Sequence, residues 1–129
     1  MTIITVTDIV HVTEADITDY VIKGDLMDSG ALTEAVYYIL LSLQTPMHGY
    51  GIMQNVHALS NGRLNLAAGT LYGAITTLLE RGLIQSAGIE DTRKKEYCIT
   101  QSGKKAVEQE IKRLTELLEN GKKIMGDRV

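Results

Sequence analysis

The C-terminal end of the sequence carries an apolar repeat that constrains the fold more than any other feature. Six residues form it, separated alternately by four and three positions: Val107, Ile111, Leu114, Leu118, Gly121 and Met125. This is the heptad spacing of a helix that packs along its length against another helix. A helix from Thr100 to about Met125 is roughly 36 Å long, which is more than a small domain covers. The repeat therefore predicts a partner helix, most simply from a second copy of the chain.

The size and composition of the chain fit one globular domain. Its 129 residues are 44% hydrophobic, which is enough for a single core. No apolar run reaches the roughly 18 residues that a membrane span needs, and the N-terminal residues do not resemble a signal peptide. The single cysteine cannot form an internal disulfide. We therefore expect a cytoplasmic protein without a membrane association.

The negative charge of the chain is unevenly distributed. The net charge is −3, but the first thirty residues alone carry six acidic residues and one basic residue. The sequence therefore predicts three parts: an acidic N-terminal extension over 1–29, a compact domain over 30–100 and a dimerisation helix over 101–129. Within the extension we expect a strand over 2–12 and a short helix over 14–23. The extension either covers apolar surface, or regulates binding or strengthens a dimer.

Two helices joined by a short break are predicted in the first half of the compact domain. The first spans 31–43, with Ser29 as its N-cap. Pro46, the only proline, prevents this helix from continuing. The second spans 49–59 and ends at the turn-forming pair 61–62. Its inward face is assigned to Tyr50, Met53 and Val56 or His57.

The third helix of the compact domain has one apolar face and one face of small residues. It is predicted from about Leu66 to Arg81, with Asn65 as its N-cap, and Gly82 ends it. The apolar face consists of Leu71, Ile75, Leu78 and Leu79. The opposite face carries Thr70, Gly73, Thr76 and Thr77. Two short helices, a turn and a third helix with a polar outer face are typical of a helix-turn-helix.

The residues after the third helix are typical of a wing. We expect a strand over 83–89, a hairpin tip over 90–93 and a return strand over 94–99. The end of the tip and the start of the return strand carry three basic residues in a row: Arg93, Lys94 and Lys95. Beside a DNA duplex, such residues are attracted by the phosphates. The sequence thus predicts a mainly α fold with a small β-hairpin wing, a winged helix-turn-helix that continues into a long dimerisation helix.

The candidate DNA contacts come from the two helices and the wing. They are Tyr50, Asn65, Thr70, Tyr72, Gly73, Thr76, Thr77, Arg93, Lys94 and Lys95. Hydroxyl groups and basic side chains suit phosphates and base edges, and a glycine in mid-helix permits close approach. The alternatives are an ordinary solvated helix face, a solvated hairpin tip, and tyrosines at 50 and 72 that lie partly in the core.

Four motifs in register resemble the PadR family of bacterial transcriptional regulators. They are Pro46-Met47-His48-Gly49-Tyr50-Gly51-Ile52-Met53, Gly69-Thr70-Leu71-Tyr72, Arg81-Gly82-Leu83-Ile84, and Arg93-Lys94-Lys95-Glu96-Tyr97-Cys98-Ile99-Thr100 with Gly103. The resemblance covers about residues 30–125. A single helix after the wing makes the chain similar to the short C-terminal subgroup of that family.

The resemblance implies a homodimeric repressor that binds a palindromic double-stranded DNA operator and is often released by a small hydrophobic effector. It also implies that the last helix packs against the first helix of the partner chain. The interface would then contain Leu32, Val36, Ile39, Val107, Ile111, Leu114, Leu118 and Met125.

The sequence contains no recognisable pattern of catalytic or metal-binding residues. Its three histidines are scattered, no cysteine pair is present, and no nucleophile set, carboxylate pair or phosphate loop is recognisable. We expect no enzyme activity, no metal and no cofactor. Cys98 should lie on the outward face of its strand, because Tyr97 and Ile99 should face inward.

Two other functions stay open at this point. One is a protein-interaction module on a winged-helix scaffold that does not bind DNA. The other, compatible with a repressor, is a ligand sensor with an apolar pocket at the dimer interface. Its walls would include Tyr37, Tyr38 and Met125.

Overall fold

The computed structural model describes residues 31–87 and 95–126. Four predicted features lie outside these ranges: the strand over 2–12, the helix over 14–23, the N-cap at Ser29 and the hairpin tip over 90–93.

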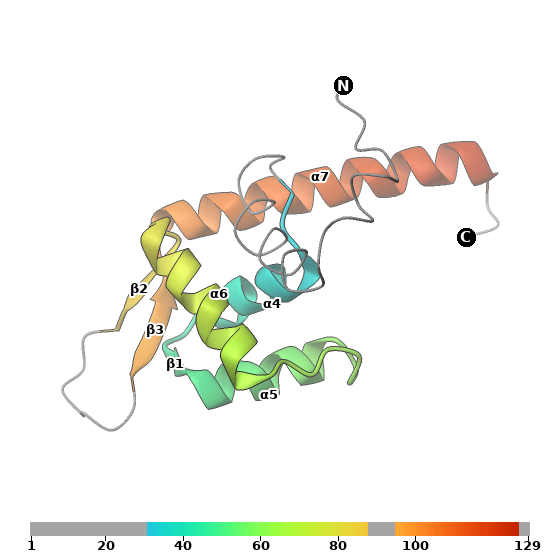
Figure 1. Cartoon of the computed structure of the whole chain (residues 1–129). Helices are drawn as coiled ribbons and strands as arrows, with labels where there is room; N and C mark the ends of the chain where they lie inside the picture. The colour runs from blue at the N-terminus through green and yellow to red at the C-terminus, as the bar shows by residue number, and fades with distance from the viewer. Residues whose placement is uncertain (1–30, 88–94, 127–129) are drawn as a thin grey trace, which may run out of the picture.

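The fold is mainly helical with a small antiparallel sheet, as the sequence predicted (Figure 1). In chain order its elements are α4 (Glu34–Ser42), β1 (Met47–His48), α5 (Gly49–Leu59), α6 (Ala68–Glu80), β2 (Ile84–Ser86), β3 (Glu96–Ile99) and α7 (Gln101–Met125). The helices α4, α5 and α6 pack together beside the sheet, and α7 crosses this group along one side.

The core between these helices is aliphatic. Its most enclosed side chains are Ile39, Leu40, Leu43, Ile52, Val56, Leu71, Ile75, Leu78 and Ile84. Tyr97 is the one aromatic residue among the buried side chains of the described part. A polar link crosses the core edge, where Asn55 Nδ2 donates to Ser42 Oγ at 2.8 Å and Ser42 Oγ donates to the Tyr38 carbonyl at 2.7 Å. This link joins α4 to α5.

The start of the first helix differs from the prediction. It begins at Glu34 instead of residue 31, because Thr33 is the N-cap and its Oγ1 accepts the Val36 amide at 3.2 Å. A threonine in this position satisfies an amide that the helix itself leaves free.

Helix α5 has the predicted bounds but another inward face. Its buried side chains are Ile52 and Val56, and Met53 is half-buried. Tyr50, which was expected inside, is exposed, and of the two alternatives Val56 and His57 the structure places only Val56 inside. The N-cap is His48, whose Nδ1 accepts the Gly51 amide at 3.0 Å.

The turn between α5 and α6 is built from Ser60, Asn61 and Gly62. Ser60 is buried, and its Oγ accepts the Leu64 amide at 2.9 Å. Asn61 and Gly62 have φ values of 54° and 82°, a left-handed conformation that these residue types tolerate best. The predicted N-cap at Asn65 is wrong, because α6 starts after Ala67, which makes no side-chain capping bond.

The wing is part of a three-stranded sheet in the order β1-β3-β2. Strand β3 pairs with β2 through Ile84 and Ile99, and with β1 through Met47 and Tyr97. Both predicted wing strands are therefore present, although β2 is described only from Ile84 to Ser86. Strand β1 was not predicted, because two residues are too few to show a period.

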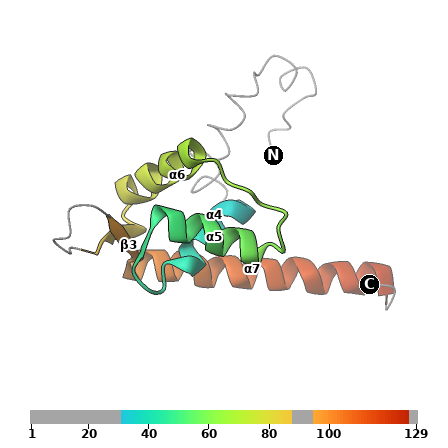
Figure 2. The same ribbon diagram turned by 90° about the horizontal axis from the view of Figure 1, so that it is seen from below.

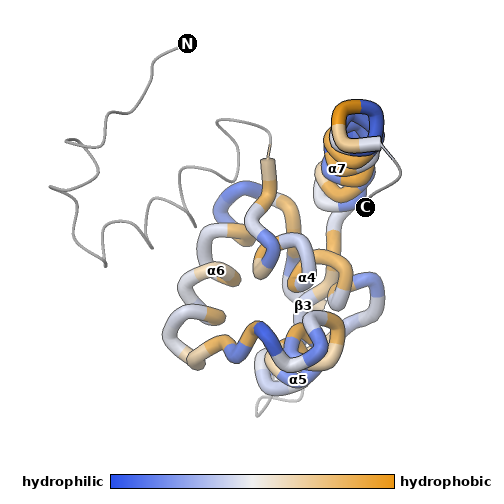
Figure 3. Tube along the Cα trace, turned by 90° about the vertical axis from the view of Figure 1, so that its right-hand side faces the viewer, coloured by the Kyte–Doolittle hydropathy of each residue, from blue (hydrophilic) through white to orange (hydrophobic). Residues whose placement is uncertain are grey.

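Helix α7 is the predicted long helix. Thr100 is its N-cap, with Oγ1 accepting the Gly103 amide at 3.1 Å. The helix runs far beyond the rest of the domain (Figure 2). Seen along its axis, apolar and polar residues lie on different sides (Figure 3). No helix of the described part has both the length and the apolar character that crossing a membrane requires.

Candidate nucleic-acid interface

The outer face of α6 consists of uncharged, exposed residues, and all of its predicted contacts except Tyr72 are small. Of its predicted contacts, Thr70, Tyr72, Gly73 and Thr76 are exposed. The opposite side inserts Leu71, Ala74, Ile75 and Leu78 into the core. Glu80, at the last position, is the only charged residue of the helix. Such a face can approach another large molecule closely without removing charged groups from water.

Thr77 was predicted to contact DNA, but the structure buries its side chain. Its side chain is 4% exposed, and its Oγ1 donates to the Gly73 carbonyl at 3.1 Å. At 100° per residue, position 77 lies at the boundary between the two faces, and neighbouring side chains cover it. Thr76 stays available: it is exposed, although its hydroxyl donates to the Tyr72 carbonyl at 2.9 Å in the free protein.

Tyr72 connects the outer face of α6 to the start of α5. Its ring packs against Gly49, so closely that a Cβ added at Gly49 would lie 2.8 Å from Tyr72 Cζ. Tyr72 is nevertheless 48% exposed, and Tyr50 is 64% exposed. The alternative that Tyr50 lies in the core is therefore wrong. Both rings lie on the surface that α5 and α6 share.

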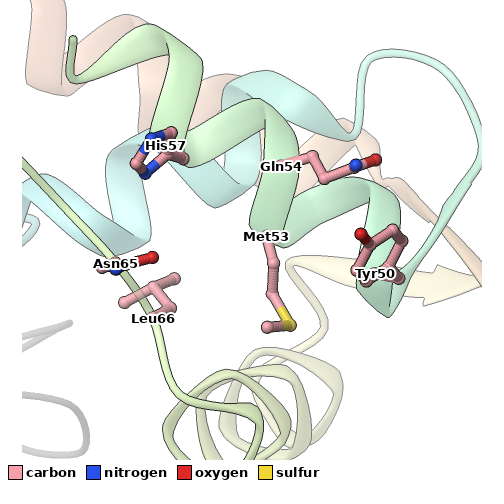
Figure 4. A pocket seen from close by; sticks show the side chains of 6 residues that line it. All are labelled: Tyr50, Met53, Gln54, His57, Asn65 and Leu66. Atoms are coloured by element: carbon pink, nitrogen blue, oxygen red, sulfur yellow. The ribbon is translucent and has the colours of Figure 1, made fainter. Parts of the chain in front are cut away.

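A groove of about 450 Å³ lies beside this surface, between α5 and the segment that leads into α6 (Figure 4). Its walls are Tyr50, Met53, Gln54, His57, Asn65 and Leu66. Tyr50 stands at one end, and His57, Asn65 and Leu66 stand at the other (Figure 4). The structure therefore places two predicted contacts, Tyr50 and Asn65, at opposite ends of one groove.

The basic residues of the wing are only partly described. Lys95, directly before β3, is exposed, whereas Arg93 and Lys94 lie outside the described residues. Cys98 is half-buried on β3, between the buried Tyr97 and Ile99, as the alternation predicted. The described residues contain no group of three or more His, Cys, Asp or Glu side chains that could hold a metal ion.

An ion pair holds the turn before α6 against the start of α4. The guanidinium of Arg63 donates two hydrogen bonds to the carboxylate of Glu34, one of them from Nη1 at 3.1 Å. These bonds lower the pKa of Glu34 below its ordinary range. Both side chains are largely exposed, so the pair adds little stability. It does, however, engage Arg63 within its own chain.

The apolar side of α7 divides into a covered part and an uncovered part. Val107, near the start, is buried against the core. The later members are exposed: Ile111, Leu114, Leu117, Leu118, Ile124 and Met125. A run of exposed large aliphatic side chains at heptad spacing is uncommon on a helix without a partner.

Four residues that were predicted at the dimer interface are instead buried within a single chain. Leu32, Val36, Ile39 and Val107 are all less than 9% exposed within a single chain. Their own core already encloses them, so they have almost no surface to offer a partner. Periodicity identified them as buried residues, but it does not tell which chain buries them.

Glu110 of α7 is a functional candidate that the sequence did not indicate. Its side chain is 2% exposed. The carboxylate accepts one hydrogen bond from the Leu32 amide at 3.3 Å and another from Nε of Arg113 at 2.8 Å. The hydrogen bonds from Arg113 lower its pKa below the ordinary range; burial opposes this, and the Leu32 amide adds to it. Glu110 is thus a buried, charged link between α7 and the entry to α4. The arginine three positions later is an ordinary pairing on helix surfaces and does not indicate that the glutamate is buried.

The predicted sensor pocket does not form within one chain. Tyr37 and Tyr38 are half-buried on α4, with ring centroids 5.9 Å apart. Met125 lies fifteen residues beyond Glu110, or about 22 Å further along α7. A pocket that contains all three would need a second chain.

Comparison with known proteins supplies a family assignment. The sequence model of the transcriptional regulator PadR-like family matches residues 37–109, from α4 into the first part of α7. A search of curated proteins returned no match.

Several solved structures share the fold. A transcriptional regulator from Clostridium thermocellum is 25% identical with a TM-score of 0.53, and the match covers 92% of this chain and 98% of that one. A PadR-like transcription factor from Bacteroides fragilis is 27% identical with a TM-score of 0.57, covering 70% and 87%. A PadR family regulator from Clostridium difficile, at 21% identity, supports the fold alone, with a TM-score of 0.60 and coverage of 73% and 100%.

Proposed function

The chain belongs to the PadR-like family of transcriptional regulators, and on this premise we propose that it represses transcription as a homodimer on a palindromic operator. DNA-binding transcription regulation, not enzyme catalysis, is the activity of this family. The single observation that carries the proposal is the pair of surfaces on one chain: a small, neutral, exposed face on α6 and an unpaired apolar stripe on α7.

In this proposal α6 enters the major groove. Small side chains at Thr70, Gly73 and Thr76 allow the backbone to come close to the base edges, and the threonine hydroxyls donate or accept hydrogen bonds there. Tyr50 and Asn65 face the flanking backbone, and Arg93, Lys94 and Lys95 of the wing neutralise phosphates. The contacts of the wing supply affinity for any DNA, whereas those of α6 supply sequence preference.

The dimer sets how far apart the two copies of α6 stand. Pairing the apolar stripes of two α7 helices gives a symmetric contact, in which each stripe covers the other. Two reading helices related by such an axis fit half-sites about one helical turn apart, roughly 34 Å. A two-fold dimer matches a palindrome for the same reason.

The substitution Gly73→Ala distinguishes a role of Gly73 in DNA binding from a role in stability. A Cβ at this position would meet nothing within 4 Å, so Gly73→Ala should stabilise the free protein by about 0.5–1 kcal/mol. The same methyl group would stand between α6 and the base edges, and we expect operator affinity to fall about fivefold or more. Thermal unfolding and fluorescence anisotropy measure the two effects. Equal or tighter operator binding by the variant would argue against close approach at Gly73.

Thr76 and Lys95 are expected to act differently on sequence preference. Thr76→Val should change which base pair is preferred at one operator position, whereas Lys95→Ala should weaken all sequences alike and reduce the salt slope by about 1. Titrations against operator and random DNA at two salt concentrations separate the two. Identical losses on both DNAs for both variants would contradict this division of roles.

Repression itself is tested by transcription in vitro. The template carries the promoter of the chain's own gene, and purified protein is added to RNA polymerase. We expect less transcript with the wild-type protein, and we expect Gly73→Ala to need about fivefold more protein for the same reduction. More transcript with wild type would identify an activator instead.

A small hydrophobic effector completes the proposal. Between two α7 stripes, the exposed leucines at 114, 117 and 118 and the half-buried Tyr37 and Tyr38 of the same chain would offer apolar walls to such a molecule. Loss of operator binding on addition of an apolar aromatic compound, with the dimer intact, supports a sensor. Unchanged binding across a panel of such compounds indicates a plain repressor.

A further inference from the structure

Polar contacts and one close backbone contact fix helix α7 to the rest of the chain at two separate points, and Val107 between them is buried against the core. The first is its N-terminal turn, where Thr100 Oγ1 donates to the Gly82 carbonyl at 2.6 Å and the Thr100 amide donates to the Leu83 carbonyl at 3.1 Å. Gly103 packs against the same segment, since an added Cβ there would overlap the Leu83 carbonyl, and it would also lie 2.6 Å from Ile99 Cγ1. The second point is Glu110, which accepts the Leu32 amide. Seven residues of helix, about 10 Å, separate Gly103 from Glu110.

Nothing in the described residues holds α7 beyond Glu110 and its partner Arg113. Every residue from 114 to 126 is exposed, and the helix projects from the domain as a free arm (Figure 2). The direction of that arm therefore depends on the two fixed points. Without the second point, α7 is held by the close contact at Gly103 and by the apolar packing of Val107, which has no preferred direction and permits a tilt.

A small pivot at this position has a large effect on DNA recognition. A rotation of about 10° displaces a point about 20 Å away by about 3.5 Å, which equals the rise of one base pair. A dimer joined through α7 contains this angle twice. The distance between its two reading helices is thus sensitive to how firmly each α7 is held against its own domain.

We propose that Glu110 is a positioning residue for operator recognition: by tying α7 to the backbone that enters α4, it fixes the angle between the dimerisation helix and the DNA-reading domain. The consequence is a narrow range of half-site separations that the dimer accepts. This inference rests on the proposed homodimer. It assigns Glu110 no contact with DNA and none with the partner chain.

The chemistry of the link suits a rigid joint. A buried carboxylate is costly unless it is paired and hydrogen-bonded, so Glu110 favours the one arrangement in which both Arg113 and the Leu32 amide reach it. Any tilt of α7 away from Leu32 would break the hydrogen bond between the Leu32 amide and the Glu110 carboxylate. An apolar contact at the same place would slide more easily, because dispersion attraction has no preferred direction.

The test measures half-site separation directly. An operator is selected from random-sequence duplexes with the wild-type protein, and a series is then made in which the two half-sites are moved closer or further apart by one and two base pairs. We expect the wild type to bind the original spacing about tenfold or more tighter than the two-base-pair variants. Glu110→Leu, which removes the acceptor, should reduce this ratio below about threefold. Glu110→Gln, which keeps an acceptor for Leu32, should lie between the two.

A matched control uses the second carboxylate–arginine pair. Glu34→Gln breaks the pair with Arg63, which joins α4 to the turn before α6 and does not involve α7. We expect Glu34→Gln to keep the spacing profile of the wild type. If Glu110→Leu does not fold, Glu110→Gln and Arg113→Gln carry the comparison.

The outcomes are distinct. A spacing profile that stays as sharp in the folded Glu110 variants as in wild type overturns the inference, even if their overall affinity falls, because a merely structural residue would weaken all spacings alike. A wild-type dimer that binds all spacings equally well overturns this inference alone, whereas a wild-type protein that is monomeric on DNA overturns the proposed homodimer and this inference with it.

Discussion

Replacing Leu118 by glutamate is expected to convert the dimer into monomers and to weaken operator binding at least a hundredfold. Leu118 is 51% exposed in the single chain and lies in the middle of the apolar stripe. In a symmetric dimer the new carboxylates from both chains would lose water near each other, which is strongly unfavourable. Each monomer would then bind one half-site without the gain from linked binding, which is typically about 10²–10⁴. Sedimentation and fluorescence anisotropy measure the two effects.

Asn120→Glu is the matched control for this variant. It introduces the same charge two residues further along α7, at an exposed position on the polar side of the helix. We expect this variant to remain dimeric and to bind the operator within about twofold of wild type. Salt screens the interaction of an exposed charge with the partner chain and with DNA. A dimeric, tightly binding Leu118→Glu variant would show that α7 pairs through another face or not at all.

Gly103→Ala is expected to have the largest effect on stability, about 3 kcal/mol of lost unfolding free energy. Gly103 is buried in the first turn of α7, and an added Cβ would overlap the Leu83 carbonyl and lie 2.6 Å from Ile99 Cγ1. The Leu83 carbonyl cannot move away without cost, because it accepts the Thr100 amide that starts α7. Urea unfolding followed by circular dichroism measures the change.

Gly73→Ala provides the comparison for that loss. It is the same substitution in another helix, at a position where the new methyl group meets nothing, and it is expected to stabilise the chain. Opposite signs for the two variants would confirm that close packing at Gly103, and not helix propensity, decides its effect. A Gly103→Ala protein as stable as wild type would contradict the tight contact between α7 and the Leu83 segment.

The sequence predicted those elements whose pattern extends over several turns. Residues 49–59 and the long helix after Thr100 have clear starts, ends and periods, and both were found with the predicted bounds to within a residue or two. The wing strands, expected over 83–89 and 94–99, were found over Ile84–Ser86 and Glu96–Ile99 within the described residues. Strand β1 escaped prediction because two residues carry no period.

The site was less predictable because its details depend on tertiary contacts. Thr77 and Thr76 are neighbours of the same type, yet only packing decides that one is buried and the other exposed. Periodicity marked Val36 as apolar-facing without telling that its own chain covers it. Glu110 sits among the charged residues of a surface helix, and its burial depends on the backbone of Leu32, 78 residues earlier. No local pattern carries that information.

A hydroxyl-radical footprint on the promoter DNA of the chain's own gene tests most directly whether paired α6 helices read DNA. The wild-type dimer should protect two regions whose centres lie about one helical turn, roughly 34 Å, apart on one face of the duplex. Both regions should disappear together in Leu118→Glu at the same protein concentration. A folded wild-type dimer that protects no region of this DNA and selects no operator from random-sequence duplexes, even at low salt, would contradict DNA reading by α6 and would favour a winged-helix adaptor that binds another protein.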